Sequence, residues 1–183
     1  MARLKEYNGH YCESEYEYAF IGFLEAEGWK YSSGNNIHRI TKRDVLIVDD
    51  FKKFIADTNP DLTKDEVTQI YDNVRLVGAE SDFATLHKVY GWMVNGVQFT
   101  PQDGLPRMIP LIEFDNWDKN IFRVVNQFTV EYTNNGQKEN RRLDVLLFVN
   151  GMPLCVIELK NPADANATIY DAWEQINIRY WRD

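Results

Sequence analysis

The hydrophobic pattern of the chain changes about halfway along. In the first half, apolar residues recur at intervals of three and four, which is the spacing of amphipathic helices. The first such stretch starts with acidic residues, which favour a helix N-terminus, and stops at Gly28. The pattern predicts four helices: residues 13–27, about 44–57, one opened by a capping box at Thr63 and Glu66, and one from Ser81 toward Tyr90.

In the second half, the pattern becomes that of β-strands. The dipeptide Asn95-Gly96 interrupts an apolar stretch over residues 92–99 and is typical of a tight hairpin turn. The strands expected after it cover residues 108–114, 122–132, 143–149 and 154–159, with a polar loop at 133–140. The last two strands are apolar on both faces, which is typical of central strands covered on both sides.

A final helix is predicted to begin near Thr168. Its apolar stripe, which we expect to pack in the core, consists of Ile169, Ala172, Trp173, Ile176 and Tyr180. Because this helical pattern is still open at Asp183, we expect the chain to be a fragment of a longer protein.

These elements predict an α/β fold of the α+β kind, with a mixed, mainly antiparallel central sheet flanked by helices. We expect one domain over residues 1–183. Within it, residues 30–100 are expected to form a helical insertion or side layer, and residues 108–183 the sheet and helix that carry the candidate chemistry.

Composition and charge narrow the function. The chain is 44% hydrophobic and 26% charged, which is ordinary for a globular domain, and its net charge of −8 argues against a broad basic surface for nucleic acid. Its longest apolar runs are far shorter than the ~20 residues of a membrane helix, so no membrane association is expected. Cys12 and Cys155 are expected to be reduced structural thiols, and the three histidines have no metal-ligand spacing.

Three charged residues stand at the ends of the two most apolar predicted strands: Asp144, Glu158 and Lys160. A buried charge is costly unless something compensates it. Two carboxylates supply the hard oxygen ligands that divalent cations prefer, and a lysine can orient or help deprotonate a metal-bound water. The residues alone leave an alternative open, in which Glu158 and Lys160 pair with each other and with Arg142 as an ordinary ionic cluster at a sheet edge.

The connection between these two strands decides whether the three groups can meet. A strict two-residue turn at Asn150-Gly151 would put Asp144 opposite Ile157 and on the other face from Glu158. A three-residue loop, or a β-bulge near Asp144, shifts the register by one residue and brings Asp144, Glu158 and Lys160 to one face. We therefore predict an odd register or a bulge.

From residue 115 onward, the sequence resembles the N-terminal nuclease domain of the R (restriction) subunit of Type I restriction-modification enzymes. Three motifs carry the resemblance: the run Asn120-Ile-Phe-Arg-Val-Val-Asn-Gln-Phe128, the stretch Arg142-Leu-Asp144 with its continuation to Asn150-Gly151, and the run Val156-Ile-Glu-Leu-Lys-Asn-Pro162. The first predicted helix, with Glu17 before Ala19-Phe20-Ile21, is similar to the opening helix of that family.

That family belongs to the PD-(D/E)xK nucleases, so the resemblance implies that Asp144 and Glu158 bind Mg²⁺ and that Lys160 is the catalytic lysine. Here Leu143 precedes Asp144 where the motif has proline. The family also carries a Gln-x-x-x-Tyr motif on the next helix, which makes Gln175 a further catalytic candidate, although Tyr180 stands one residue too far along. Glu17 is a candidate metal ligand or a group that supports the ligands.

The resemblance further implies Mg²⁺-dependent, site-specific cleavage of double-stranded DNA by a cytoplasmic complex with modification and specificity subunits. It also implies an ATP-driven motor elsewhere in the full subunit, since the chain has no Gly-x-x-x-x-Gly-Lys-Ser/Thr phosphate loop. Two alternatives stay open: an inactive nuclease-like module that docks DNA or partner subunits, and a self-sufficient nuclease without a motor. The intact Asp144, Glu158 and Lys160 favour an active enzyme.

Overall fold

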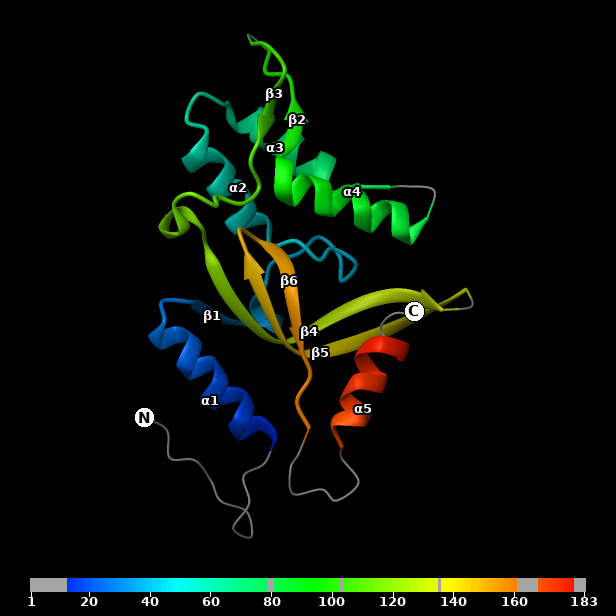
Figure 1. Ribbon diagram of the computed structural model, residues 1–183. Coiled ribbons are helices and arrows are strands. Elements are labelled where there is room, and N and C mark those ends of the chain that lie inside the picture. The colour runs from blue at the N-terminus through cyan, green and yellow to red at the C-terminus, as the bar shows by residue number, and fades with distance from the viewer. Residues whose placement is uncertain (1–12, 79–80, 103, 135, 161–167, 180–183) are drawn as a thin grey trace.

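A four-stranded sheet organises the molecule, with helices α2, α3 and α4 gathered toward one end and α1 and α5 toward the other (Figure 1). The computed structural model describes residues 13–78, 81–102, 104–134, 136–160 and 168–179, and only the backbone of Asp82, Asn134 and Arg179. The strand order is β1-β4-β5-β6, with β1 parallel to β4 and the other neighbours antiparallel. The predicted α/β class, with a mixed and mainly antiparallel central sheet, is confirmed.

The helices of the described residues are α1 (Glu13–Ala26), α2 (Val48–Thr58), α3 (Lys64–Arg75), α4 (Asp82–Asn95) and α5 (Ile169–Glu174), which continues as a π-helical turn over Gln175–Arg179. Short 3₁₀ turns cover Gly34–Asn36 and Trp117–Lys119. The central strands are β1 (Lys30–Ser33), β4 (Phe122–Asn134), β5 (Gln137–Val149) and β6 (Met152–Ile157), and a separate two-stranded sheet pairs β2 (Val97–Phe99) with β3 (Arg107–Ile109). None of the described helices is both long and apolar enough to span a bilayer.

Side-chain caps open three of the helices where the sequence predicted them. Thr63 and Glu66 form the expected capping box at the start of α3, and Ser81 accepts a hydrogen bond from the amide of Ala84 at the start of α4. Thr168 and Asp171 make a second capping box at α5. Such caps satisfy backbone amides that have no partner within the helix, so these starts follow from local sequence alone.

The hairpin predicted at Asn95-Gly96 is wrong. Helix α4 runs through Asn95, and Gly96 ends it with a φ of 83° while its amide donates to the carbonyl of Trp92. Glycine is favoured here because the left-handed region suits a residue without Cβ, whether it closes a helix or a hairpin. The hairpin lies one step further on, between β2 and β3, and outside the central sheet.

The central sheet differs from the predicted one at both edges. Strand β1 was not predicted, because its sequence Lys-Tyr-Ser-Ser lacks an apolar alternation. Strand β6 was expected to be covered on both faces, but it is an edge strand on which Leu154, Cys155 and Val156 are exposed. The expectation of a structural, packed thiol at Cys155 is therefore wrong, and Cys12 lies outside the described residues.

Two further expectations fail for a shared reason. The polar stretch predicted as a loop at 133–140 belongs largely to β4 and β5, which pair out to Asn134 and Gln137. On α5, Ile169 is 91% exposed and Trp173 is 49% exposed, so this stripe is not packed into the described core, while Tyr180 lies outside the described residues. In both places contacts with distant parts of the chain decide the outcome, which is strand pairing in the first case and burial in the second. Periodicity alone does not encode such contacts.

Two buried ion pairs join the helices to the rest of the fold. Arg123 on β4 donates to both oxygens of Asp50 on α2, at 2.5 and 2.8 Å, and these hydrogen bonds to the Asp50 carboxylate raise the pKa of Arg123 above its ordinary value. Arg75 on α3 donates to Asp44 at 2.6 Å. Burial by itself would raise the pKa of Asp44, but hydrogen bonds from Arg75 and Thr41 outweigh it and hold this pKa below its ordinary value.

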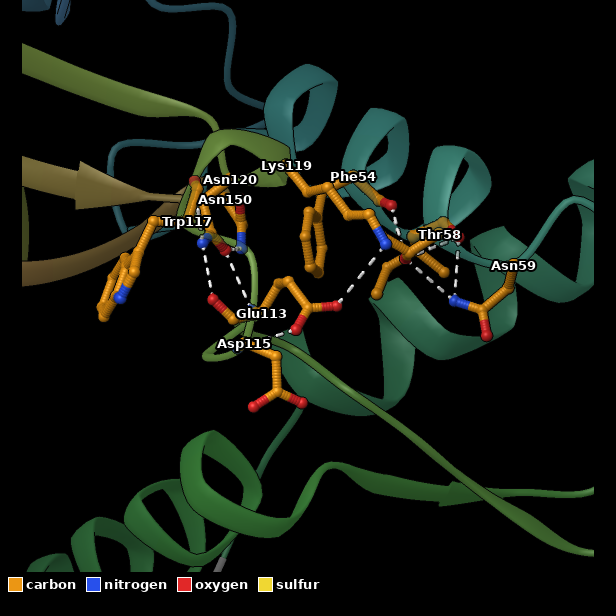
Figure 2. A network of polar contacts seen from close by, with 10 residues as sticks. Phe54, Thr58, Asn59, Glu113, Asp115, Trp117, Lys119, Asn120 and Asn150 are labelled. Carbon is orange, nitrogen blue, oxygen red and sulfur yellow. Dashed lines mark hydrogen bonds and ion pairs between the residues drawn. The ribbon is translucent and has the colours of Figure 1, made fainter.

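The turn between β5 and β6 is buried and fully hydrogen-bonded. Asn150 and Gly151 both have positive φ, 52° and 77°, as a two-residue hairpin turn requires. The Asn150 side chain accepts from the amide of Ile121 at 2.7 Å and donates to the carbonyl of Leu111 and to Asn120, which links it to the loop around Glu113 (Figure 2). The turn is thereby tied to the segments that precede β4.

A bulge follows this turn and sets the register. Val149 pairs with Met152 and Phe148 with Pro153, as a strict two-residue turn demands, but Leu147 then pairs with Cys155. The extra residue on β6 is Leu154, and it shifts all later pairs by one. The predicted bulge is confirmed, and the residue after the Val145–Ile157 pair on each strand is Asp144 and Glu158.

We expect the Asn150→Ala variant to lose about 2–4 kcal/mol of unfolding free energy in urea denaturation, because it removes the side-chain partner of the Ile121 amide and the Leu111 carbonyl and places alanine at positive φ. Asn150→Gly removes the same hydrogen bonds without the backbone strain and should be less destabilising by about 1 kcal/mol. Asn140→Ala on the exposed part of β5 is the control. Equal losses below about 1 kcal/mol for both Asn150 variants would contradict this role of the amide.

Candidate active site at the ends of strands β5 and β6

The candidate site lies where β6 ends, between α1 and α5 (Figure 1). The carboxylate of Asp144 on β5 accepts a hydrogen bond from the backbone amide of Leu159 at 3.0 Å. Leu159 stands between Glu158 and Lys160, so one oxygen of Asp144 is fixed against the segment that carries the other two predicted residues. The Asp144 carboxylate thus accepts a hydrogen bond from a backbone amide that lies beyond Ile157, the last residue of β6.

Glu158, Lys160 and Gln175 form one hydrogen-bonded group. The Lys160 ammonium donates to Glu158 Oε1 at 3.0 Å and to Gln175 Oε1 at 2.9 Å, and the Gln175 amide donates to the same oxygen of Glu158. The Glu158 side chain is 3% exposed and that of Lys160 is 24% exposed, so the carboxylate is enclosed while the ammonium still reaches solvent. The structure thus brings together the four residues predicted at the site, with Gln175 supplied by the helical segment after α5.

Gln175 opens the π-helical turn that follows α5. Turns of this kind often occur at functional sites. Tyr180, the other half of the family's glutamine–tyrosine motif, lies outside the described residues. The contact of Gln175 with both Glu158 and Lys160 is therefore the part of the motif that the structure describes.

Glu17 on α1 belongs to a second cluster, which it forms with side chains of strand β4, the neighbour of β5. Its carboxylate, 5% exposed, accepts from the Asn126 amide at 2.6 Å through one oxygen and from the Gln127 amide at 2.9 Å through the other. Tyr31 on β1 donates to the amide oxygen of Asn126 at 3.0 Å. Burial first, and then the charges of Tyr18 and Glu17, raise the pKa of Tyr31, which keeps this hydroxyl protonated as a donor.

The donor set at Asp144 and Glu158 fits a hard divalent cation. Mg²⁺ is often held by one or two carboxylates and completes its shell with water and substrate phosphate. Among the described residues, no group of three or more His, Cys, Asp and Glu side chains is arranged to hold a metal. A two-carboxylate site with solvent and phosphate ligands is compatible with that finding, whereas a structural cage made of protein alone is not.

The sequence missed Asn126, Gln127 and Tyr31. Asn126 and Gln127 belong to the run Asn120–Phe128 that carried part of the family resemblance, but the run looks like an ordinary strand. The available signal was a pair of consecutive amide residues inside an apolar strand. Buried polar side chains of this kind need partners, and here the partner is Glu17.

Comparison with known proteins extends the resemblance over nearly the whole chain. Residues 11–183 match the family described as Type I restriction enzyme R protein N terminus (HSDR_N). The matched stretch includes the middle third, which resembled nothing by its motifs. It also includes α1 with Glu17, the four-stranded sheet and the segment that carries Gln175.

Curated relatives are named as endonuclease subunits of Type I restriction enzymes. The chain is 34% identical over 167 residues to the MjaIXP type I restriction enzyme endonuclease subunit of Methanocaldococcus jannaschii, and 29% identical over 177 residues to the HindI endonuclease subunit of Haemophilus influenzae. These alignments cover 86% and 89% of this chain but 16% of each relative, so the chain spans about a sixth of their length. The protein described here belongs to the family of N-terminal domains of Type I restriction enzyme R proteins.

Proposed function

We propose that this domain cleaves double-stranded DNA by metal-dependent hydrolysis of a phosphodiester bond. The observation that carries the proposal is the hydrogen bond from the Leu159 amide to Asp144, which fixes one carboxylate against the backbone between Glu158 and Lys160. In a member of a restriction enzyme family, this places two acidic groups and one ammonium at the end of an apolar sheet. The structural alternative, a plain ion pair of Glu158 with Lys160, does not account for Asp144 and Gln175.

Asp144 and Glu158 would hold the cation, for which we propose Mg²⁺. Such a cation supplies charge stabilisation for the pentavalent phosphorus and lowers the pKa of a bound water. The protein's part is to keep both carboxylates in place and to limit the water around them. Asp144 is anchored by the Leu159 amide, and Glu158 by the amide of Gln175 and the ammonium of Lys160.

Lys160 is proposed as the catalytic lysine. Its ammonium carries three donors, of which one meets Glu158 and another Gln175, and its partial exposure leaves it open to a water or a phosphate oxygen. In this position it can orient the attacking water and stabilise the charge that develops on the phosphate. Gln175 holds both Lys160 and Glu158 and so fixes their distance from each other.

A locally basic region supports DNA as the substrate. We call the loop 37–43 and the outer part of the β4–β5 hairpin, residues 128–143, the basic arm. It contains six Lys and Arg residues against two Glu, a balance of +4 in a chain of −8: Arg39, Lys42, Arg43, Lys138, Arg141 and Arg142 against Glu131 and Glu139. The Lys42 carbonyl accepts from the Glu131 amide at 3.0 Å, which joins the loop to the hairpin.

The basic arm reaches the candidate site, because Arg142 is two residues from Asp144 on β5, and the paired strands extend beyond the rest of the sheet (Figure 1). Phosphate contacts dominate the affinity of most DNA-binding proteins. The expectation that an acidic chain lacks a basic surface for DNA thus does not apply to this region. In the full R protein, we propose that the domain acts in the cytoplasm, together with modification and specificity subunits and an ATP-driven motor.

Asp144→Ala and Lys160→Ala should each reduce nicking of plasmid DNA by about 10²-fold or more in the assembled restriction complex supplied with Mg²⁺ and ATP, because Asp144 would hold the cation and Lys160 would stabilise the developing charge. ATP hydrolysis by the same complexes should persist. Asp118→Asn, an exposed carboxylate on the turn before β4, is the control and should cut normally. Normal cleavage by both site variants would instead support a docking module without catalytic function.

Metal binding should appear as stabilisation of this chain. At a Mg²⁺ or Mn²⁺ concentration about ten times the dissociation constant, a ligand of the folded state adds about 1.4 kcal/mol, which corresponds to a rise of about 3–6 °C in Tm for a domain of this size. Asp144→Ala should remove most of the shift, and Glu27→Gln should keep it. No shift of the unmodified chain at tens of millimolar metal would remove the proposed metal site.

The basic arm predicts a change in salt dependence. For a short DNA duplex without divalent metal, the double variant Lys42→Gln/Arg142→Gln should reduce the slope of log K against log[salt] by about 1.8, since each lost phosphate contact contributes about 0.9. Fluorescence anisotropy over a range of salt concentrations measures this slope. Lys64→Gln/Lys88→Gln, on α3 and α4, is the matched control of equal charge. Equal slopes for the two double variants would show that DNA does not contact the arm.

A further inference from the structure

The alternation of side chains on β4 shifts by one residue at Gln127. Val124 packs against Ile21 and Leu24 of α1, whereas Val125 packs on the opposite side with Phe128. Strict alternation would place residues 125 and 128 on opposite faces of the strand. The shift coincides with a φ of 53° at Gln127, a left-handed conformation that is uncommon for a residue other than glycine.

Strand β5 shows the same shift at Asp144. Val145 packs with the α1 side, while Leu143 packs with Leu146 and Phe148 on the other side, although residues two apart on a strand ordinarily share a face. Asn126 pairs with Val145, and Phe128 pairs with Leu143. Gln127 and Asp144 therefore lie opposite each other between these two pairs, and both strands break their alternation at this position.

Hydrogen bonds among four side chains stabilise this shifted alternation. Because the alternation shifts, the consecutive residues Asn126 and Gln127 both turn toward α1, and each donates to a different oxygen of Glu17. Tyr31 occupies the Asn126 amide oxygen, which leaves the amide NH₂ for Glu17. A buried carboxylate that accepts two amide donors is fixed in both position and orientation.

Gly34 allows the backbone to approach the break. A Cβ at this buried position would lie 2.6 Å from the carbonyl oxygen of Gln127, 2.7 Å from the Cα of Phe128 and 2.9 Å from the carbonyl oxygen of Asn126. These are backbone atoms, which cannot move aside as the end of a flexible side chain can. The turn after β1 is thus packed against the one irregular residue of β4.

We propose that Glu17, Asn126 and Gln127 are positioning residues that stabilise the shifted alternation at Gln127 and Asp144 and thereby keep the Asp144 carboxylate on the Leu159 amide. The cause of the shift is local: a left-handed Gln127 costs conformational energy, and the two hydrogen bonds to Glu17 offset it. The shift affects the site because Gln127 lies opposite Asp144. Glu17 on α1 then supports the acidic site through its contacts with β4 and is not itself a ligand of the cation. The catalytic importance of this support rests on the proposed function.

Amide hydrogen exchange of Leu159 tests the arrangement without metal or DNA. In this chain, Gln127→Val should raise the exchange rate of the Leu159 amide about tenfold or more, because a β-branched residue strongly disfavours the left-handed region. Gln127→Gly tolerates that region and loses only the amide, so it should raise the rate less. Glu17→Gln should raise it as well, since it replaces an acceptor oxygen with an NH₂ that faces an amide donor.

Two controls separate this effect from general destabilisation. The amide of Val67 in α3, bonded to Thr63, reports on the rest of the fold and should exchange at its normal rate in every variant. Glu25→Gln removes a charge from an exposed position of the same helix α1 and should leave the Leu159 amide unchanged. Where Gln127→Val raises the exchange of both amides, Gln127→Gly and Glu17→Gln decide the outcome.

Unchanged Leu159 exchange in the Glu17 and Gln127 variants would overturn the proposal. Cleavage by the assembled complex adds a second reading: Glu17→Gln should lower the maximal rate while the metal concentration for half-maximal activity changes less than about threefold. An increase in that concentration as large as for Asp144→Asn would make Glu17 a metal ligand instead and also overturn the proposal. If the proposed cleavage function is wrong, Asp144→Ala will cut DNA normally, and the exchange result will still stand.

Discussion

Every polar group of Asn150 is removed from water, and the arrangement of the sheet depends on how these groups are hydrogen-bonded. Leaving one of them without a partner would cost about 1–3 kcal/mol. The partners come from Leu111, Asn120 and Ile121, so the buried turn depends on the position of the chain before β4. Gly151 extends the constraint to α2, because the amide of Ile47 donates to its carbonyl at 2.8 Å.

The same turn determines the chemistry at the other end of the strands. The two-residue turn is followed by one bulge. If the register of the Val145–Ile157 pair is continued by one residue, Glu158 comes opposite Asp144. Beyond this point β6 ends, and hydrogen bonds of side chains replace those between the strands. Asp144 accepts from the Leu159 amide, and Glu158 accepts from Lys160 and Gln175. Charged groups are tolerated beside a core of valine and leucine because each has such partners.

The features that the sequence predicted are those that depend on neighbours in the chain. The capping box at Thr63 is local, and the bulge follows from requiring Asp144 to meet Glu158. Features that depend on distant segments were missed or misassigned. Strand β1 is polar and pairs only because β4 offers an edge, and Gly96 has a conformation that suits a helix end as well as a hairpin.

The candidate site shows the same division. Asp144, Glu158 and Lys160 stand out because charge is unusual in so apolar a stretch, and Gln175 entered through family resemblance. The cluster around Glu17 could not be predicted, because it requires knowing that α1 crosses β4 at Asn126 and that Gln127 is left-handed. No local pattern in the sequence distinguishes such a residue from its extended neighbours.

The wide turn that starts at Gln175 bears on how a helix can accommodate one extra residue. In a regular α-helix, one inserted residue rotates everything after it by about 100°, which would carry a side chain off its face. A π-helical turn closes its hydrogen bonds one residue later and absorbs the extra residue within itself. Within Gln175–Arg179, the residues that share a helix face are therefore set by the wider geometry of this turn and not by the regular α-helical spacing.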